Sequence, residues 1–441
     1  MTQDWKELYR QKVIPVEDIV KVIPPHSHCS LSDGAADPRA ITREIEKRYA
    51  EFTDVSFMQG PPGERIDMFD PQMKGHIRYE PFVGPVGQYK DYWEGVRTGV
   101  SDYLPSYFSS IERLMRDGHY PIDVAIVSLS TPNDQGYCTL GVSCSYQRAA
   151  MQAAKIVIAE VNKQMPRMFG ETSVHVSELD HIIEADEPLP VIPDAPIGDA
   201  ERQIGEFCAS LIEDGSTIQA GIGKLPNAAL DALVGKKDLG VHSELFTTKM
   251  MDLAEKGVIT ASKKTLHNGI NIATVLEGTK ELYDWSNDNP FVQLFPVGYV
   301  NNPMVIAQND KLVSINSCIE VDLFGQVAAE SFGHKQATGA GGQVDFVRGA
   351  TMSRGGKSII VINSTAARGT VSKIRVFLTP GSLVTTPRNE TQFIVTEYGI
   401  ADLRGKTNKE RAKALINIAH PDFRESLVEE FMNYFGFDPL R

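Results

Sequence analysis

Cysteine is scarce in this sequence, and long apolar runs are missing. The five cysteines are odd in number and scattered, with no Cys-x-x-Cys pair and no cysteine and histidine at the spacing of a zinc site. No run of about 18 uncharged apolar residues occurs, and the stretch from Met1 to Lys6 lacks the apolar core of a signal peptide. These absences argue against a disulfide framework, a bound metal and a membrane span. They predict a reduced, cytoplasmic protein.

Positive charge is also in short supply. Lys and Arg number 44 against 57 Asp and Glu, which gives a net charge of -13. An excess of negative charge repels nucleic-acid phosphates and anionic lipid, so we expect neither as a partner. An anionic ligand can then bind only through local donors, such as a helix N-terminus or a single Lys or Arg side chain.

The chain is long enough for more than one domain. Its 441 residues correspond to two or three domains at about 150 residues each. Four prolines fall within the acidic span from Glu184 to Ala200, which is the clearest change of composition in the sequence. We therefore expect an N-terminal domain over residues 1–190 and a C-terminal domain over residues 191–441.

Short apolar runs alternate with helical patterns in both halves, which is typical of buried parallel strands. The clearest runs are Val124–Leu129 and Lys155–Val161 in the first half, and Thr217–Ala220, Leu312–Ile315, Ser358–Ile362 and Gln392–Val395 in the second. Each half also has such a run followed by a turn from Asp to Gly, at Asp134–Gly136 and Asp322–Gly325. The sequence therefore predicts an α/β fold of two similar domains with largely parallel sheets, and an active site in the cleft between them.

Two glycine-rich segments resemble nucleotide-binding motifs but lack a required residue. Gly356-Lys357-Ser358 would end a phosphate-binding loop only with a glycine at position 351, which is Thr351. Gly221-Ile-Gly223 would begin a dinucleotide fingerprint only with a glycine at position 226, which is Pro226. The sequence supports neither a nucleotidase nor a dehydrogenase.

The segment Gly221–Pro226 has a different interpretation. It follows the run Thr217–Ala220 and opens a helix whose first position suits Pro226. A strand-loop-helix junction with little side-chain bulk presents backbone N–H groups to a negatively charged group. A tight turn that needs glycine only for its backbone angles explains the segment equally well.

A second glycine cluster lies in Thr338–Phe346, where three of the four residues at 339–342 are glycine. Glycines outside a low-complexity segment indicate close approach of the backbone to another group. A structural bulge is the alternative.

A single acidic residue, Glu244, interrupts the end of a run that should be buried, Val241–Phe246. Burying a carboxylate is costly unless another group pairs with it or a reaction uses it. On these residues alone, a solvated glutamate at a strand end is the simpler interpretation. His242 is likewise interpreted as a packing residue rather than a base.

Taken together, several motifs resemble the acetyl-CoA hydrolase/transferase family, and within it the 4-hydroxybutyrate and butyryl-CoA:acetate CoA-transferases. The motifs follow one another along nearly the whole chain. They are Phe57–Gly60, Ser130–Gly141, Glu160–Pro166, Gly221–Ala229, Leu239–Glu244, Gly341–Gly349 and Val395–Gly405.

The resemblance implies that Glu244 is a nucleophile, which reverses the simpler interpretation above. A glutamate with an ordinary pKa of about 4.3 is ionised at neutral pH and can attack a thioester without a general base. The implied activity is transfer of CoA between a butyryl-, 4-hydroxybutyryl-, propionyl- or acetyl-CoA and a carboxylate such as acetate, through a glutamyl-CoA thioester. An acyl-CoA hydrolase that uses the same glutamate is the alternative. A non-catalytic CoA-binding protein is a third, which Glu244 and both glycine loops disfavour.

The resemblance also implies the partners and the other site residues. Coenzyme A is then a substrate and covalent intermediate rather than a resident cofactor, and the protein is a homo-oligomer, as a dimer or a tetramer. Oxyanion and CoA contacts are implied at Gly221, Ile222, Gly223, Lys224, Leu225, Ile319, Gly341, Gly342 and Arg368, and positioning of the acyl group or carboxylate at Gln219 and Asn316. Two segments depart from the family pattern: Ala367 stands where relatives carry Lys, and Pro24–Cys29 replaces a glycine-rich start.

Overall fold

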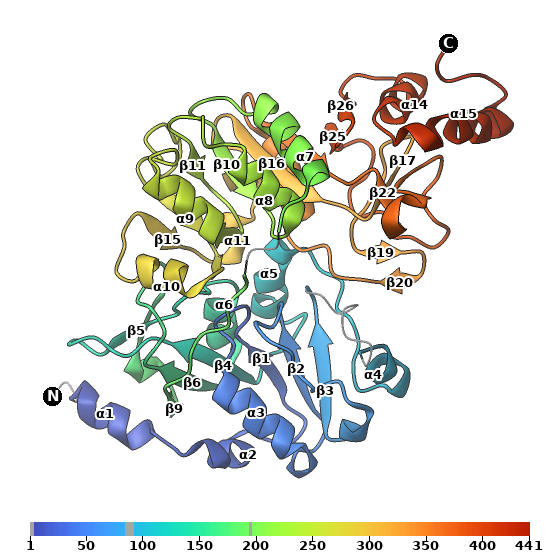
Figure 1. The fold of residues 1–441 in the computed structure, drawn as a ribbon. Coiled ribbons are helices and arrows are strands. Elements are labelled where there is room, and N and C mark those ends of the chain that lie inside the picture. Colours follow the sequence, from blue (N-terminus) through green and yellow to red (C-terminus); the bar gives the residue numbers. More distant parts are fainter. Residues whose placement is uncertain (1–3, 84–91, 194–195) are drawn as a thin grey trace. The chain divides into compact units, whose positions relative to one another are not determined.

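The computed structural model describes residues 4–83, 92–193 and 196–441, and the chain divides into two compact units. The first unit is Met1–Pro193 with Ile272–Val300, and the second is Asp194–Asn271 with Asn301–Arg441. The expected boundary between residues 190 and 191 remains a prediction. In the structure, residues 272–300 belong to the first unit. Each unit is built on its own six-stranded sheet (Figure 1).

In the first unit every neighbouring pair of strands in the large sheet is parallel. The order is β3 (Ile77–Pro81), β2 (Val55–Gln59), β1 (His28–Leu31), β4 (Val124–Leu129), β6 (Ile156–Asn162) and β9 (His181–Ala185). All six residues of β4 are buried. Burial on both faces explains why this strand is a continuous apolar run in the sequence rather than an alternating one.

Helices cover the first sheet, and α3 (Arg39–Lys47) illustrates why they form. Its apolar residues Ile41 and Ile45 are four apart, so they share one face, and both are fully buried in a core with Leu31 and Phe57. Each such side chain contributes about 1.5–3 kcal/mol through burial. The other helices of this unit are α1 (Trp5–Lys12), α2 (Ile19–Val22), α4 (Tyr92–Thr98), α5 (Ile111–Arg116), α6 (Gln147–Ala153), α10 (Lys280–Ser286) and α11 (Val297–Val300).

The large sheet of the second unit is parallel except for its last strand. The order is β11 (Gly240–Val241), β10 (Thr217–Ala220), β16 (Leu312–Ser317), β21 (Lys357–Val361), β25 (Phe393–Thr396) and β26 (Gly399–Asp402). As in the first unit, the first strand along the chain has the second on one side and a later strand on the other. The prediction of two similar α/β domains with largely parallel sheets is confirmed.

One helix boundary in the second unit differs from the expectation. Helix α8 (Lys224–Asp231) begins at Lys224 with Gly223 as its N-cap, so Pro226 is the third helical residue and not the first. The φ of 110° at Gly223 allows this earlier start. Helix α7 (Asp199–Leu211) ends before Gly215, which lies in the turn leading to β10.

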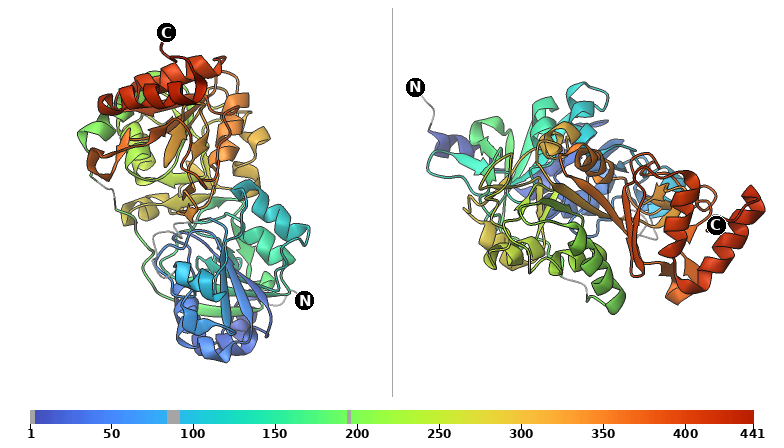
Figure 2. Two further views of the ribbon diagram at one scale, coloured as in Figure 1. Left: turned by 90° about the vertical axis from the view of Figure 1, so that its right-hand side faces the viewer. Right: turned by 90° about the horizontal axis from the view of Figure 1, so that it is seen from above.

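The remaining helices of the second unit are α9 (Thr248–Glu255), α12 (Pro303–Ile306), α13 (Gln343–Met352), α14 (Asn408–Asn417) and α15 (Pro421–Phe435). Helices α14 and α15 lie side by side near the C-terminus, as the red ribbons in both views show (Figure 2). Within the described ranges, none of these or the other helices combines the length and the apolar character needed to span a bilayer.

Candidate active site

The candidate residues gather at the carboxyl ends of the parallel strands of the second sheet. Strand β10 leads into Gly221, β11 leads into Glu244, and Asn316 is the last but one residue of β16. Parallel strands end at one common edge, and in open α/β sheets this edge is where ligands bind. The fold therefore brings together segments that are far apart in the sequence.

Glu244 lies between β11 and β12 (Leu245–Thr247), half-buried rather than solvated. Asn301 donates a hydrogen bond from Nδ2 to Glu244 Oε2 at 2.7 Å. A side chain at Gly342 would overlap both of these atoms, so only glycine leaves room for the pair. The structure thus places two of the predicted residues, Glu244 and Gly342, against one another.

Asn301 was not among the residues predicted from the sequence. It stands next to Asn302, whose Oδ1 accepts a hydrogen bond from the Met304 N–H at 2.9 Å and caps α12. Asn301 itself is fully buried and points to the carboxylate. The pair Asn301-Asn302 before Pro303 is typical of a helix start, so the sequence contains no signal that separates the site residue from the cap.

The second glycine cluster leads directly into a helix, α13. Gly341 has a φ of 55°, and Gly342 is the N-cap of α13. The first turn of a helix presents unpaired N–H groups and a partial positive charge, which favour a carboxylate beside them.

His242 lies two residues before Glu244 and is fully buried. Its ring is edge-on to that of Phe346, with 6.4 Å between the ring centroids, which fits the packing role expected of it.

Gln219 and Asn316 form a reciprocal amide pair across neighbouring strands. Gln219 Nε2 donates to Asn316 Oδ1 at 3.2 Å, and Asn316 Nδ2 donates to Gln219 Oε1 at 3.0 Å. Both side chains are buried. Gly221 lies beside them, because a Cβ there would be 3.8 Å from Asn316 Oδ1. The structure therefore brings three more of the predicted residues together.

The segment after β10 is exposed where it turns into α8. Ile222 is 48% exposed, an unusual position for a large apolar side chain, and Gly223 and Lys224 are exposed beside it. Leu225 is half-buried in the first turn of the helix. This arrangement offers backbone N–H groups and an apolar side chain on one accessible surface.

Two predicted residues lie on other segments of the same unit. Ile319 is half-buried just after β16, where its N–H donates to Ala328 O at 2.9 Å. Arg368 is exposed on the turn between β22 (Thr365–Ala366) and β23 (Val371–Ser372). Ala367 and Arg368 have φ of 49° and 59°, in the left-handed region that residues other than glycine seldom adopt. The assignment of Ile319 and Arg368 to CoA remains a prediction.

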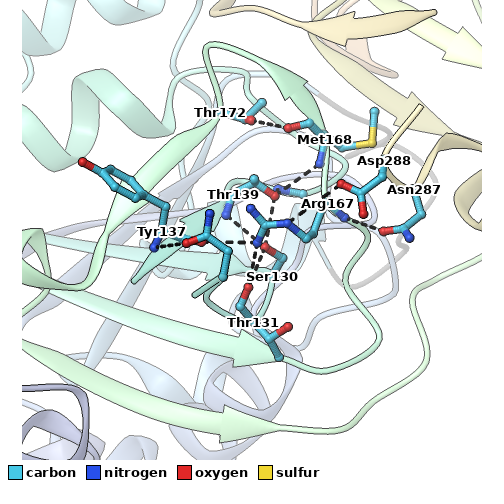
Figure 3. Close-up of polar contacts among 11 residues, drawn as sticks. Ser130, Thr131, Tyr137, Thr139, Arg167, Met168, Thr172, Asn287 and Asp288 are labelled. Carbon is cyan, nitrogen blue, oxygen red and sulfur yellow. Dashed lines mark hydrogen bonds and ion pairs between the residues drawn. The ribbon is translucent and has the colours of Figure 1, made fainter. Parts of the chain in front are cut away.

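The first-unit motif Ser130–Gly141 forms a scaffold of hydrogen bonds (Figure 3). Arg167 Nη1 donates to Thr131 O at 3.0 Å and to Tyr137 O at 3.2 Å. The backbone N–H of Arg167 donates to Asn287 Oδ1 at 2.8 Å. These contacts join three segments of the first unit, so the motif helps to hold this unit together.

Both halves of the chain match known family models. Residues 1–193 match the acetyl-CoA hydrolase/transferase N-terminal domain, and residues 278–431 match the corresponding C-terminal domain. The chain is 47% identical to 4-hydroxybutyrate coenzyme A transferase of Clostridium kluyveri, over 98% of this chain and 100% of that protein. It is 42% identical to succinyl-CoA:cyclohexane-1-carboxylate CoA transferase of Geobacter metallireducens, over 97% of this chain and 96% of that protein.

Solved structures agree with these matches. The crystal structure of 4-hydroxybutyrate CoA-transferase from Porphyromonas gingivalis is similar with a TM-score of 0.82 and 41% identity, over 98% of this chain and 100% of that chain. Acetyl-CoA hydrolase of Saccharomyces cerevisiae is more distant, at 23% identity over 86% of this chain. This chain therefore belongs to the acetyl-CoA hydrolase/transferase family, and within it to the CoA-transferases.

Proposed function

We propose that this enzyme moves CoA between a short-chain acyl-CoA and a carboxylate such as acetate, with Glu244 as the nucleophile. The observation that carries the proposal is the surroundings of Glu244. Its carboxylate is half-buried, bonded to Asn301 Nδ2 and packed against a glycine that cannot be replaced without overlap. Such a carboxylate is held in one place and stays reachable, as a nucleophile requires.

In the first half of the proposed reaction, a Glu244 oxygen attacks the thioester carbonyl of the donor. The carbonyl electrons move onto oxygen, then return as the C–S bond breaks, which leaves an acyl-glutamyl anhydride and CoA thiolate. The thiolate next attacks the glutamyl carbonyl of the anhydride. The donor carboxylate leaves, and the enzyme holds a glutamyl-CoA thioester.

The second half runs through the same steps with the acceptor. The acceptor carboxylate attacks the glutamyl thioester, which releases CoA thiolate and forms a new anhydride. The thiolate attacks the acceptor's acyl carbonyl, giving the new acyl-CoA and the free Glu244 carboxylate. No proton is gained or lost over the cycle, so the reaction needs no general base.

Each of these steps passes through a negatively charged oxygen, which requires hydrogen-bond donors placed in advance. Asn301 Nδ2 and the start of α13 at Gly342 support such stabilisation at the glutamyl carbonyl. The Gly221–Leu225 segment, which is exposed at residues 222–224, supports it at the acyl carbonyl, with Ile222 lying against CoA. Removal of one donor of this kind costs about 3 kcal/mol, or a hundredfold or more in rate.

The remaining assignments belong to the same proposal. Ile319, Gly341 and Arg368 contact CoA, while Gln219 and Asn316 orient the carboxylate. The names of the relatives favour 4-hydroxybutyrate among the substrates. We further propose a cytoplasmic homo-oligomer that holds CoA only as substrate. In the described part of the chain, no group of three His, Cys, Asp or Glu side chains is arranged to hold a metal ion.

The proposal is tested by incubating the enzyme with butyryl-CoA alone and digesting it for mass spectrometry. A CoA adduct is expected on the peptide that contains Glu244, and parallel double-reciprocal lines are expected when acetate is varied. Product analysis with and without acetate separates transfer from hydrolysis. A protein that releases butyrate equally well without acetate is a hydrolase, and an enzyme with no adduct and intersecting lines does not use this mechanism.

A further inference from the structure

We infer that Lys264 is a positioning residue, which fixes β11, the strand that leads into Glu244, by binding an outward backbone group of that strand. The inference rests on the proposed function, because it assigns Lys264 an effect on the Glu244 reaction. Its basis is a set of backbone contacts around β11 that none of the predicted site residues makes.

Strand β11 is the outermost strand of its sheet, with β10 on one side. On the other side, Leu239, the residue before β11, bridges to Ile259, but β11 itself pairs with no further strand. The N–H of Gly240 donates to Ser216 O at 3.0 Å, and the N–H of His242 donates to Ile218 O at 3.2 Å. Because backbone groups alternate along a strand, the N–H and C=O of Val241 face away from β10. They are buried groups, and each requires a hydrogen-bond partner from elsewhere.

Two side chains from one segment supply these partners. Lys264 Nζ donates to Val241 O at 2.8 Å, and Asn271 Oδ1 accepts a hydrogen bond from the Val241 N–H at 2.9 Å. Lys264 is 3% exposed, and Asn271 is fully buried. The strand edge is therefore completed by side chains in place of a further strand.

The lysine is built tightly into this position. Its Nζ also donates to Ile270 O at 2.7 Å, and a side chain at Gly240 would overlap the lysine stem. Among the described residues, no carboxylate forms an ion pair with Lys264. Burial lowers the pKa of Lys264 to about 7, so an ammonium group here costs stability, and its two carbonyl acceptors partly offset that cost.

The location of the contact connects it to the reaction. Val241 ends β11, and the chain reaches Glu244 three residues later. A fixed carbonyl at Val241 limits how far the following segment can shift. A displacement of about 1 Å at a reacting group can cost on the order of a hundredfold in rate.

The test compares Lys264→Met with Lys357→Met. Methionine keeps an apolar stem of similar length and removes the donors. Lys357 is the matched control, because its Nζ also donates to a backbone carbonyl, Leu211 O at 2.7 Å, but at the amino end of β21. For Lys264→Met we expect kcat to fall about tenfold to a hundredfold, with the KM for acyl-CoA within about twofold of the wild type. The rate of CoA-adduct formation should fall by the same factor, whereas Lys357→Met should lower the melting temperature and leave kcat unchanged.

A milder variant keeps the test decisive if Lys264→Met does not fold. Gly240→Ala pushes the lysine stem aside without removing the ammonium group, and we expect a severalfold loss of kcat at an unchanged KM. If both variants fold, an unchanged kcat in both would overturn the inference. If Lys264→Met does not fold, an unchanged kcat in Gly240→Ala would overturn it. Glu244→Ala is assayed in parallel. Retained activity there would refute the proposed function, whereas an inactive Glu244→Ala beside a fully active Lys264→Met would refute only the positioning role.

Discussion

The two large sheets place a carboxylate at the same kind of edge but surround it differently. In the first unit, β1 leads to Asp33, which is 1% exposed and accepts hydrogen bonds from Ser143 Oγ at 2.5 Å, Ser145 Oγ at 2.9 Å and Gln147 Nε2 at 2.9 Å. In the second unit, Glu244 follows β11 and is only half-buried. One carboxylate is enclosed by donors, and the other keeps a reachable side.

This difference fits a structural role for Asp33 and the proposed nucleophilic role of Glu244. Burial raises the pKa of Asp33, and its hydroxyl and amide donors oppose that shift by favouring the charged form. A carboxylate enclosed in this way stabilises the fold but cannot reach a substrate. Glu244 is packed against Gly342 but only half-buried, so part of its side chain stays exposed.

The largest expected effect is that of Glu244→Ala, which removes the proposed nucleophile. We expect kcat to fall at least about a thousandfold, while the fold and the affinity for CoA are retained. Glu244→Asp withdraws the carboxylate by about 1 Å and should cost on the order of a hundredfold. Steady-state rates and calorimetric binding of CoA check both variants. Near-normal turnover of Glu244→Ala would move the nucleophile elsewhere.

The next effect concerns the glycine that packs against the carboxylate. In Gly342→Ala the new methyl group must displace Glu244 or Asn301, so kcat should fall about a hundredfold. The φ of -94° at Gly342 is ordinary for alanine, so backbone strain does not contribute. Gly349→Ala in the same helix is the control, because its methyl group meets only the Ile306 side chain. The control should lower the melting temperature and leave the kcat of the folded enzyme unchanged.

Asp33→Ala tests the other half of the comparison. It leaves the donors of Ser143, Ser145 and Gln147 buried without their acceptor, which should lower the free energy of unfolding by about 3 kcal/mol. Denaturant titration measures this loss, and initial rates on the folded fraction should stay within about twofold of the wild type. A large loss of turnover at unchanged stability would show that the first edge takes part in the reaction.

A smaller effect is expected in the segment after β10. Gly221→Ala is well tolerated by the protein itself, since the nearest atom to the new methyl group is 3.8 Å away. A loss of about tenfold in kcat/KM at an unchanged melting temperature would indicate that the backbone lies against the thioester. Gly223 is less informative, because its φ of 110° strains any side chain. Gly235→Ala, with no atom within 4 Å of the new methyl group, is the control.

The last prediction concerns no change in turnover but a pH dependence of stability from the first unit. Burial raises the pKa of Glu160, which accepts a hydrogen bond from the Ile41 N–H, from 4.5 to about 7. Between these values the folded chain keeps a proton that the unfolded chain has lost, so stability falls as pH rises, by up to about 3 kcal/mol. Glu160→Gln should flatten this slope in melts from pH 4.5 to 7. An unchanged slope would assign the dependence to another carboxyl.

Patterns local in the sequence predicted much of this fold. The run Val124–Leu129 is a buried strand because parallel strands are apolar on both faces, and Thr217–Ala220 has the predicted bounds. The start of α8 was misplaced because the φ of Gly223, rather than the ring of Pro226, determines where the helix begins.

Long-range contacts could not be predicted in the same way. Asn301 reaches Glu244 across 57 residues, and no spacing rule connects them. Lysine is usually a surface residue, yet the fold buries Lys264 against a strand edge. In both cases the neighbours of a polar side chain are set by the topology of the sheet, which sequence periodicity does not determine.

The closed edge at Val241 has a consequence for association between chains. An outer strand with unpaired backbone groups is a template on which another chain can add a strand. Lys264 and Asn271 occupy the outward groups of Val241, so an incoming strand finds no hydrogen-bonding partner at that residue. The lysine that we propose as a positioning residue therefore also closes Val241 to strand addition.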